Sequence, residues 1–214
     1  MLSVYGRRPA SVVVEPVAKA FLRVGLTPNV ATVLGTAATV LVAVVLIPAD
    51  HLVAAALLSL FFAAFDMVDG TMARLRGGGT AFGATLDASC DRITDGALFG
   101  AIVMWLVYVD RASALTVAVG VVVLVLSQVI SYVKARGEAG GLRIVGGLIE
   151  RPERLILAVV GLMLQGAGVP GALAGALWVL AVGSAVTVVQ RLVVAARDPR
   201  ALEPVAPPAG VTRR

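Results

Sequence analysis

Aspartate is the residue type whose placement in this sequence most clearly suggests chemistry. Five aspartates lie between residues 66 and 95, in segments that are otherwise strongly apolar, with only three basic residues among them. A charged side chain at membrane depth costs about 2.5–3.5 kcal/mol on insertion scales, so these acids need a counter-charge. Three arginines are too few for five carboxylates, which indicates that a bound cation supplies the remaining positive charge.

The spacing of these aspartates predicts one shared site. Asp66 and Asp69 are three residues apart, and Asp87 and Asp91 are four apart, so each pair shares a helix face. A short loop between the helices predicts antiparallel neighbours with all four carboxylates at similar depth. Hard oxygen ligands favour Mg²⁺, with Mn²⁺ or Ca²⁺ as alternatives, and Mg²⁺ often completes its coordination with substrate phosphates. Asp95 is either a fifth ligand or an ion-pair partner, and we favour the ion pair.

The elements that position these acids are predicted to be membrane helices. The chain has 214 residues, of which 59% are hydrophobic and 14% charged, and its mean hydropathy is +0.95. A soluble domain carries about 25% charged residues, so the bilayer must take part in burying this chain. We predict an all-α integral membrane fold with six transmembrane helices, at residues 28–49, 52–75, 82–109, 113–134, 153–169 and 172–195.

The predicted domain organisation has three parts. Residues 1–26 form an amphipathic juxtamembrane segment, with an interfacial helix from Ser11 to Leu26 that mixes apolar and charged side chains. Residues 27–196 form the six-helix membrane domain. Residues 197–214 are rich in Pro, Ala and Arg and are predicted to be a disordered cytoplasmic tail. The single cysteine excludes an intramolecular disulfide, and no cleavable signal peptide is evident.

Basic residues predict how the chain is oriented. Of the 18 Lys and Arg residues, 16 fall before the first span, around the loops after spans two and four, or after span six. The positive-inside rule places these regions, the acidic site and both termini in the cytoplasm. We therefore expect a multi-pass protein of the cell (inner or plasma) membrane, in contact with membrane lipid and without a nucleic-acid partner.

The aspartates belong to a longer motif that resembles a known family signature. The motif is Asp66-x-x-Asp69-Gly70-x-x-Ala73-Arg74, then eight residues, then Gly83-x-x-x-Asp87-x-x-x-Asp91. All eight fixed positions resemble the signature of the CDP-alcohol phosphotransferase family, and the resemblance covers about residues 27–195. It implies an enzyme that transfers a substituted phosphate from a CDP-linked donor to an alcohol and releases CMP.

The resemblance also implies roles for individual residues and a homodimeric assembly. Asp66, Asp69, Asp87 and Asp91 would bind metal, expected as two Mg²⁺ ions with Mn²⁺ as an alternative, and Asp91 would also act as general base. The donor, CDP-diacylglycerol, would lie near residues on both sides of the acids: Asn29, Thr32, Asp69, Gly70, Ala73, Arg74, Thr80 and Gly83.

Further motifs narrow the expected acceptor. The segments 131–138 (Ser-Tyr-x-Lys-Ala-Arg-x-Glu) and 149–154 (Ile-Glu-Arg-Pro-Glu-Arg) resemble the actinobacterial phosphatidylinositol phosphate synthases, a group within that family. That likeness implies transfer to 1D-myo-inositol 3-phosphate (L-myo-inositol 1-phosphate). Lys134, Arg154 and Arg191 would lie at cytoplasmic helix ends and suit a phosphate monoester, so we expect them to bind the inositol phosphate. Alternatively, these basic residues only contact lipid headgroups. Arg136 and Arg151 are left undecided.

Two other functions stay open at this point. A phosphatidylglycerol phosphate synthase, which uses glycerol 3-phosphate, needs a similar basic pocket, so only the local motifs argue against it. A cation or proton transporter would also carry acids within the membrane. A transporter site is expected near the midplane with access to both faces, whereas these acids cluster toward one face.

Overall fold

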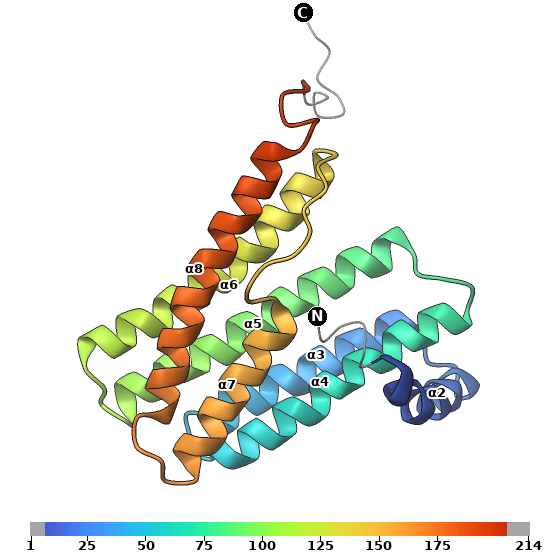
Figure 1. The fold of residues 1–214 in the computed structure, drawn as a ribbon. Coiled ribbons are helices and arrows are strands. Elements are labelled where there is room, and N and C mark those ends of the chain that lie inside the picture. Colours follow the sequence, from blue (N-terminus) through green and yellow to red (C-terminus); the bar gives the residue numbers. More distant parts are fainter. Residues whose placement is uncertain (1–6, 205–214) are drawn as a thin grey trace, which may run out of the picture.

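The residues described by the structure, a computed structural model, are 7–204, without the side chains of residues 7–13 and of Asp66. They form helices and no strand, which confirms the all-α prediction. Figure 1 shows α6 and α8 side by side, with α3 and α4 as a second pair. The helices are α2 (Arg7–Arg23), α3 (Pro28–Leu46), α4 (Leu52–Leu75), α5 (Ala81–Tyr108), α6 (Ala114–Ala139), α7 (Arg151–Gly166) and α8 (Ala172–Arg197).

Local side-chain caps explain where three of the helices begin. Thr27, Thr80 and Ser113 each accept a hydrogen bond from the backbone N–H three residues later, at 3.3, 2.9 and 3.2 Å. Pro28 occupies the first turn of α3, where its missing N–H costs nothing. Because these signals are local, the predicted starts of α3, α5 and α6 agree with the structure to within one residue.

Four of the described helices, α3, α4, α6 and α8, are long and apolar enough to cross a membrane. The other two predicted spans, α5 and α7, differ from them in composition or length. α5 has 28 residues but carries Asp87, Asp91, Arg92 and Asp95. α7 has 16 residues, about 24 Å of helix, against a hydrocarbon core of about 30 Å. By length and composition, the described helices therefore include four candidate spans, and the six-span arrangement stays a prediction.

The packing order differs from the prediction at the acidic helices. α3 packs against both α4 and α5, α5 also packs against α6, and α7 packs against α4 and α8. The expected direct packing of α4 on α5 is wrong, because the described residues of these two helices do not approach closely. Carboxylates on two tightly packed faces would repel at low dielectric, and the glycine-rich loop after α4 allows the separation.

The N-terminal helix α2 lies across one end of α4 (Figure 1). Ala18 of α2 is fully buried in a small apolar cluster with Val68 and Met72 of α4. The helix covers 7–23, where 11–26 was expected. Part of its apolar face is thus packed on α4.

The opposite end of the bundle is tied by one side-chain hydrogen bond. Trp105 Nε1, near the end of α5, donates to Asp50 Oδ1 at 2.7 Å. Asp50 lies in the turn between α3 and α4 with φ of 63°, a left-handed conformation that aspartate tolerates better than most residues. The bond attaches the α3–α4 turn to α5 at the end predicted to face away from the cytoplasm.

Asp198 ends α8 and holds the turns that follow it. Its Oδ2 accepts from the backbone N–H of Arg143, and its Oδ1 accepts from that of Arg200, each at 2.9 Å. These bonds to the charged carboxylate hold the pKa of Asp198 below its usual range. The part of the predicted tail at residues 198–203 is therefore attached to the α6–α7 loop, and residues 205–214 lie outside the described residues.

The contact between α7 and α8 depends on Gly161. A Cβ at this position would lie 2.8 Å from Cβ of Ala176 and 3.3 Å from Cδ1 of Leu173. Gly161→Ala should therefore destabilise the protein by about 1–3 kcal/mol, measured as a lower thermal unfolding temperature in detergent. Gly175→Ala on α8 is the matched control, because nothing lies within 4 Å of its Cβ position and alanine favours helix. An equal loss in both variants would contradict the close contact.

Candidate active site

The first turns of α3 connect the two acidic helices. Thr32 Oγ1 donates to Asp69 Oδ2 of α4 at 2.5 Å, and both residues are buried. Asn29 lies beside the start of α5, since a Cβ at Gly83 would be 3.3 Å from its Oδ1. The structure thus places two predicted donor-binding residues of α3 against the two halves of the acidic motif: Thr32 at Asp69, and Asn29 at Gly83.

The last turns of α4 hold a guanidinium close to Gly70 and Thr71. Arg74 Nη2 donates to Thr71 Oγ1 at 2.6 Å. Arg74 Nη1 would lie 3.6 Å from a Cβ at Gly70, so glycine leaves room there. The Gly70 N–H donates to Asp69 Oδ1 at 2.5 Å. Three predicted donor-binding residues, Gly70, Ala73 and Arg74, therefore occupy one stretch of helix after Asp69.

The four predicted metal-binding aspartates differ in burial. Asp69 is buried, Asp91 is partly buried and Asp87 is exposed. The backbone of Asp66 lies in α4. Among the side chains that the structure describes, which leave out that of Asp66, no three His, Cys, Asp or Glu residues form a group that could hold a metal ion. The four-aspartate metal site therefore stays a prediction.

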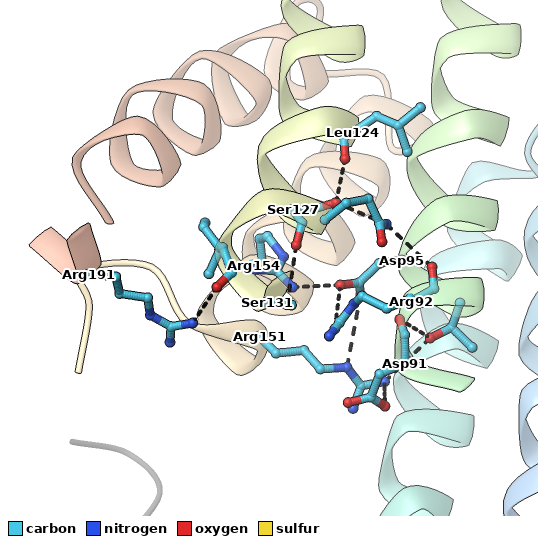
Figure 2. A network of polar contacts seen from close by, with 12 residues as sticks. Asp91, Arg92, Asp95, Leu124, Ser127, Ser131, Arg151, Arg154 and Arg191 are labelled. Atoms are coloured by element: carbon cyan, nitrogen blue, oxygen red, sulfur yellow. Dashed lines mark hydrogen bonds and ion pairs between the residues drawn. The ribbon is translucent and has the colours of Figure 1, made fainter. Parts of the chain in front are cut away.

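A network of ion pairs joins α5 to α7 next to these acids (Figure 2). Arg154 Nη2 lies 2.5 Å from Asp95 Oδ2, and the two side chains are 2% and 10% exposed. Arg151 Nη2 lies 2.9 Å from Asp91 Oδ1, and its Nε lies 3.9 Å from Asp95 Oδ1. Arg92 adds a contact to Asp95 at 3.2 Å. Asp95 has the geometry of an ion-pair partner, as we favoured from the sequence.

The order of these pairs reveals a signal that the sequence analysis did not use. Asp91 and Asp95 are four residues apart on α5, and Arg151 and Arg154 are three apart on α7. Arg151 meets Asp91 and Arg154 meets Asp95, so the pairs follow the same direction along both helices. Such pairing is predicted when two helices begin at the same end of the bundle and one carries two acids, the other two arginines, at helical spacing. Arg151, left undecided above, is thereby placed in the site.

Arg191, one of the three residues predicted to bind inositol phosphate, holds the α6–α7 loop to α8. It is 5% exposed. Its Nη1 donates to the Ile130 carbonyl at 2.8 Å, its Nε to the Gly146 carbonyl at 3.1 Å, and its Nη2 contacts Glu150 Oε1 at 3.4 Å. Gly146 has φ of 81°, a conformation that favours glycine. Arg191 therefore fixes the segment that leads into α7.

The other two predicted acceptor residues lie in contrasting surroundings. Arg154 is 1% exposed and its Nε and Nη1 have no hydrogen-bond partner within the described part of the chain. Lys134 is exposed on α6, with its Nζ 3.9 Å from Glu138 Oε1. Lys134, Arg154 and Arg191 thus differ in exposure, and only Arg154 combines burial with unused donors.

A pocket extends from the ion-pair network into the bundle. Its lining is partly polar, and the hydroxyl of Ser59 is buried there without a hydrogen-bond partner among the described residues. Such a site suits ordered water, which needs polar partners. The lining residues are Thr39, Ala43, Ser59, Ala63, Thr94, Asp95, Leu98, Arg151 and Leu155.

A helical membrane bundle with this acidic motif defines a class of enzyme, and the comparison with protein families agrees. Residues 25–190 match the family model for CDP-alcohol phosphatidyltransferase. The chain belongs to this family, which confirms the resemblance seen in the motif. The matched region runs from just before α3 into α8, so it contains both the aspartates and the arginine network.

Two curated relatives are similar over nearly the whole chain. The phosphatidylinositol phosphate synthase of Corynebacterium glutamicum is 61% identical over 210 residues, which are 98% of this chain and 96% of the relative. The phosphatidylinositol phosphate synthase of Mycobacterium tuberculosis strain H37Rv is 50% identical over 204 residues, which are 92% of this chain and 91% of the relative.

Two crystal structures of the Mycobacterium tuberculosis phosphatidylinositol phosphate synthase share the fold. The structure with CDP-DAG bound has a TM-score of 0.87 at 49% identity, and the match covers 91% of this chain and 98% of that chain. The structure in complex with manganese and citrate has a TM-score of 0.85 at 49% identity, covering 90% of this chain and 93% of that chain.

The buried pair at Asp95 should contribute strongly to stability. Asp95→Asn leaves Arg154 buried without its carboxylate, so we expect a loss of about 3–5 kcal/mol, seen as a lower thermal unfolding temperature. Glu138→Gln is the matched control, because its pair with Lys134 is about half exposed on both sides. It should change stability by less than about 1 kcal/mol. Similar losses in the two variants would refute the assignment of Asp95 as the main tie.

The hydrogen bond between α3 and α4 can be tested separately. Thr32→Val keeps the side-chain shape but removes a donor from buried Asp69, which should cost about 1–3 kcal/mol of unfolding free energy. Thr36→Val is the control, because the Thr36 hydroxyl bonds to a carbonyl of its own helix at 2.8 Å. Denaturation of both variants in the same detergent should show the larger effect at Thr32, and the reverse order would contradict the structure.

Proposed function

We propose that this protein is a phosphatidylinositol phosphate synthase. It transfers the phosphatidyl group of CDP-diacylglycerol to 1D-myo-inositol 3-phosphate and releases CMP. Family membership makes the chain a phosphatidyltransferase. The observation that carries the choice of acceptor is the 61% identity over 98% of the chain to the Corynebacterium glutamicum phosphatidylinositol phosphate synthase.

The donor would bind where α3 meets the ends of α4 and α5. Arg74 supplies a guanidinium suited to phosphate, and the start of α5 supplies backbone N–H groups with a favourable dipole. The Mycobacterium tuberculosis relative, 49% identical to this chain, has been solved with CDP-DAG bound, which supports the same donor here. The proposed contacts are Asn29, Thr32, Asp69, Gly70, Ala73, Arg74, Thr80 and Gly83.

Divalent cations would be held by Asp66, Asp69, Asp87 and Asp91, with two Mg²⁺ ions expected and Mn²⁺ as an alternative. The donors fit, since all four are carboxylates, which supply the hard oxygen ligands that such cations prefer. The relative solved with manganese supports a divalent metal. Bound cations of this kind neutralise the phosphate oxygens and stabilise the leaving group.

Asp91 would act as general base. It takes the proton of the acceptor hydroxyl while that oxygen forms a bond to the lipid-side phosphorus of the donor. The bond from this phosphorus to the bridging oxygen breaks, and CMP leaves with the electron pair. Before metal and acceptor bind, Arg151 would hold the Asp91 carboxylate through the 2.9 Å contact.

The phosphate of the acceptor would bind among Lys134, Arg154 and Arg191. Buried polar groups are rarely left without partners, and the two unused donors of Arg154 are best explained by an anionic ligand. A hydroxyl of a neutral alcohol could also accept from these donors, but it would add no negative charge beside the three basic residues. Arg191 is engaged with backbone carbonyls, so we propose that it shapes the pocket as well as adding positive charge.

We further propose that α5 and α7 also span the membrane, giving six spans. Two of the charges that exclude α5 by composition, Asp91 and Asp95, are paired with arginines of α7, which lowers their cost at membrane depth. The distribution of Lys and Arg supports a cytoplasmic site and cytoplasmic termini in the cell membrane. A homodimer is supported by the family resemblance alone.

The proposal is tested by CMP release from the purified protein in detergent with Mg²⁺ and CDP-diacylglycerol. Inositol 3-phosphate, glycerol 3-phosphate and free inositol are offered separately, and only the first should give CMP. EDTA should abolish release, and Asp91→Asn should lower the rate by about 100-fold or more. Asp110→Asn, a matched change of an exposed aspartate outside the site, should retain activity.

The other outcomes distinguish the alternatives. Release with glycerol 3-phosphate instead would make the protein a phosphatidylglycerol phosphate synthase with the same proposed metal site. No release with any acceptor, from protein shown to be folded, would contradict the proposed reaction and reopen the transporter hypothesis.

A further inference from the structure

We propose that Arg151 is a counter-ion that exchanges partners, leaving Asp91 for the phosphate monoester of the acceptor when a metal ion takes Asp91. Metal binding and acceptor binding would then strengthen each other. This inference rests on the proposed function, because it requires Asp91 as a metal ligand and an acceptor that carries a phosphate. It concerns a positioning role for Arg151 that the motif does not imply.

The exposure of the two arginines distinguishes a fixed partner from an exchangeable one. The Arg154–Asp95 pair is almost fully buried, with side chains 2% and 10% exposed. The Arg151–Asp91 pair is more accessible, with side chains 32% and 20% exposed. A guanidinium that is partly in solvent can change partners without a large desolvation cost, whereas a fully buried one cannot.

Arg151 has secondary contacts that would keep it near the site after it leaves Asp91. Its Nε lies 3.9 Å from Asp95, and its Nη2 lies 3.5 Å from Thr94 Oγ1. It is the first residue of α7, and Pro152 follows it in the first turn, so the backbone is held in place. Loss of the Asp91 contact therefore redirects the guanidinium and does not release it to bulk solvent.

The charge of the cluster explains why a phosphate should follow the metal. Among the described side chains, the ion pairs given above join two carboxylates, Asp91 and Asp95, to three guanidiniums, Arg92, Arg151 and Arg154. When Asp91 is committed to a metal ion, these described pairs keep one carboxylate for three guanidiniums. A phosphate monoester carries about −1.5 to −2 charge at neutral pH and accepts bidentate bonds from arginine. A neutral alcohol would leave the excess charge unbalanced.

Thermodynamic linkage gives the measurable consequence. If the acceptor's phosphate draws Arg151 away from Asp91, the metal competes with one fewer cation for that carboxylate. The factor by which the phosphate tightens metal binding must then equal the factor by which metal tightens phosphate binding. Coupling of this kind between two sites typically amounts to about 5–150-fold.

The experiment measures Mn²⁺ binding to the full-length protein in detergent, by the electron paramagnetic resonance signal of free Mn²⁺. Titrations are made alone, with 1D-myo-inositol 3-phosphate, and with free inositol as the neutral control. In the unmodified protein we expect the phosphate ester to lower the Kd for Mn²⁺ by about 5-fold or more. Free inositol should leave the Kd unchanged.

Variants of Arg151 identify the residue that carries the coupling. Arg151→Gln should bind Mn²⁺ alone more tightly than the unmodified protein, and the phosphate ester should tighten it no further. Arg151→Lys keeps the charge but cannot bridge Asp91 and Asp95, so it should bind Mn²⁺ alone more tightly and couple more weakly. Arg143→Gln removes an exposed guanidinium outside the network and should behave as the unmodified protein does.

Each contrary result overturns the proposal. An unchanged Mn²⁺ affinity in Arg151→Gln, or coupling retained there, would show that Arg151 does not exchange partners. If Arg151→Gln does not fold, Arg151→Lys provides the same test. The exchange is refuted if Arg151→Lys has the same Mn²⁺ affinity and the same coupling as the unmodified protein. The assay of CMP release by the unmodified protein distinguishes failure of the partner exchange from failure of the proposed function. If CMP is released but the phosphate ester does not tighten Mn²⁺ binding, only the exchange is refuted. If no CMP is released, the proposed function is refuted.

Discussion

The buried ion pair between Asp95 and Arg154 is the interaction on which the site end of this bundle depends. Charges within an apolar bundle are tolerated only when each has a close partner of opposite sign. The pair therefore ties α7 to α5, whereas the apolar side chains of α7 pack against α4 and α8. Arg151, three residues earlier, then falls beside Asp91. The proposed base, metal ligand and acceptor arginines consequently belong to one electrostatic unit.

The prediction from sequence was accurate where the determining forces are local. Caps at Thr27, Thr80 and Ser113 lie within one turn of the helix starts that they define, so the boundaries followed from short motifs. Which helices pack against each other was harder to predict from the sequence. Hydropathy says which segments are apolar but not which ones touch, and a short loop suggested that α4 packs on α5. The structure instead places α3 against both helices.

Side-chain partners were the hardest feature to predict, because they depend on how each helix is rotated about its axis. Lys134, Arg154 and Arg191 all carry suitable charges at suitable helix ends, yet one is exposed, one is paired with a buried acid and one binds backbone carbonyls. The family motif assigned the aspartates without this information, since it fixes residue types at fixed spacing. The spacing of Arg151 and Arg154 also indicates their pairing with Asp91 and Asp95, but the surroundings of Lys134 and Arg191 required the three-dimensional arrangement.

The hydrogen bond between Trp105 and Asp50 has a mechanical consequence for the far end of α5. It fastens the helix to the α3–α4 turn at one end, while Asp91 lies 14 residues away along the chain, about 21 Å along the helix axis. The fastened end acts as a fulcrum and the intervening helix as a lever arm. A tilt of a few degrees about Trp105 moves Asp91 by more than an ångström but hardly shifts the fulcrum. The buried pair of Asp95 with Arg154 opposes such a tilt near Asp91, so α5 is held at both ends of this segment.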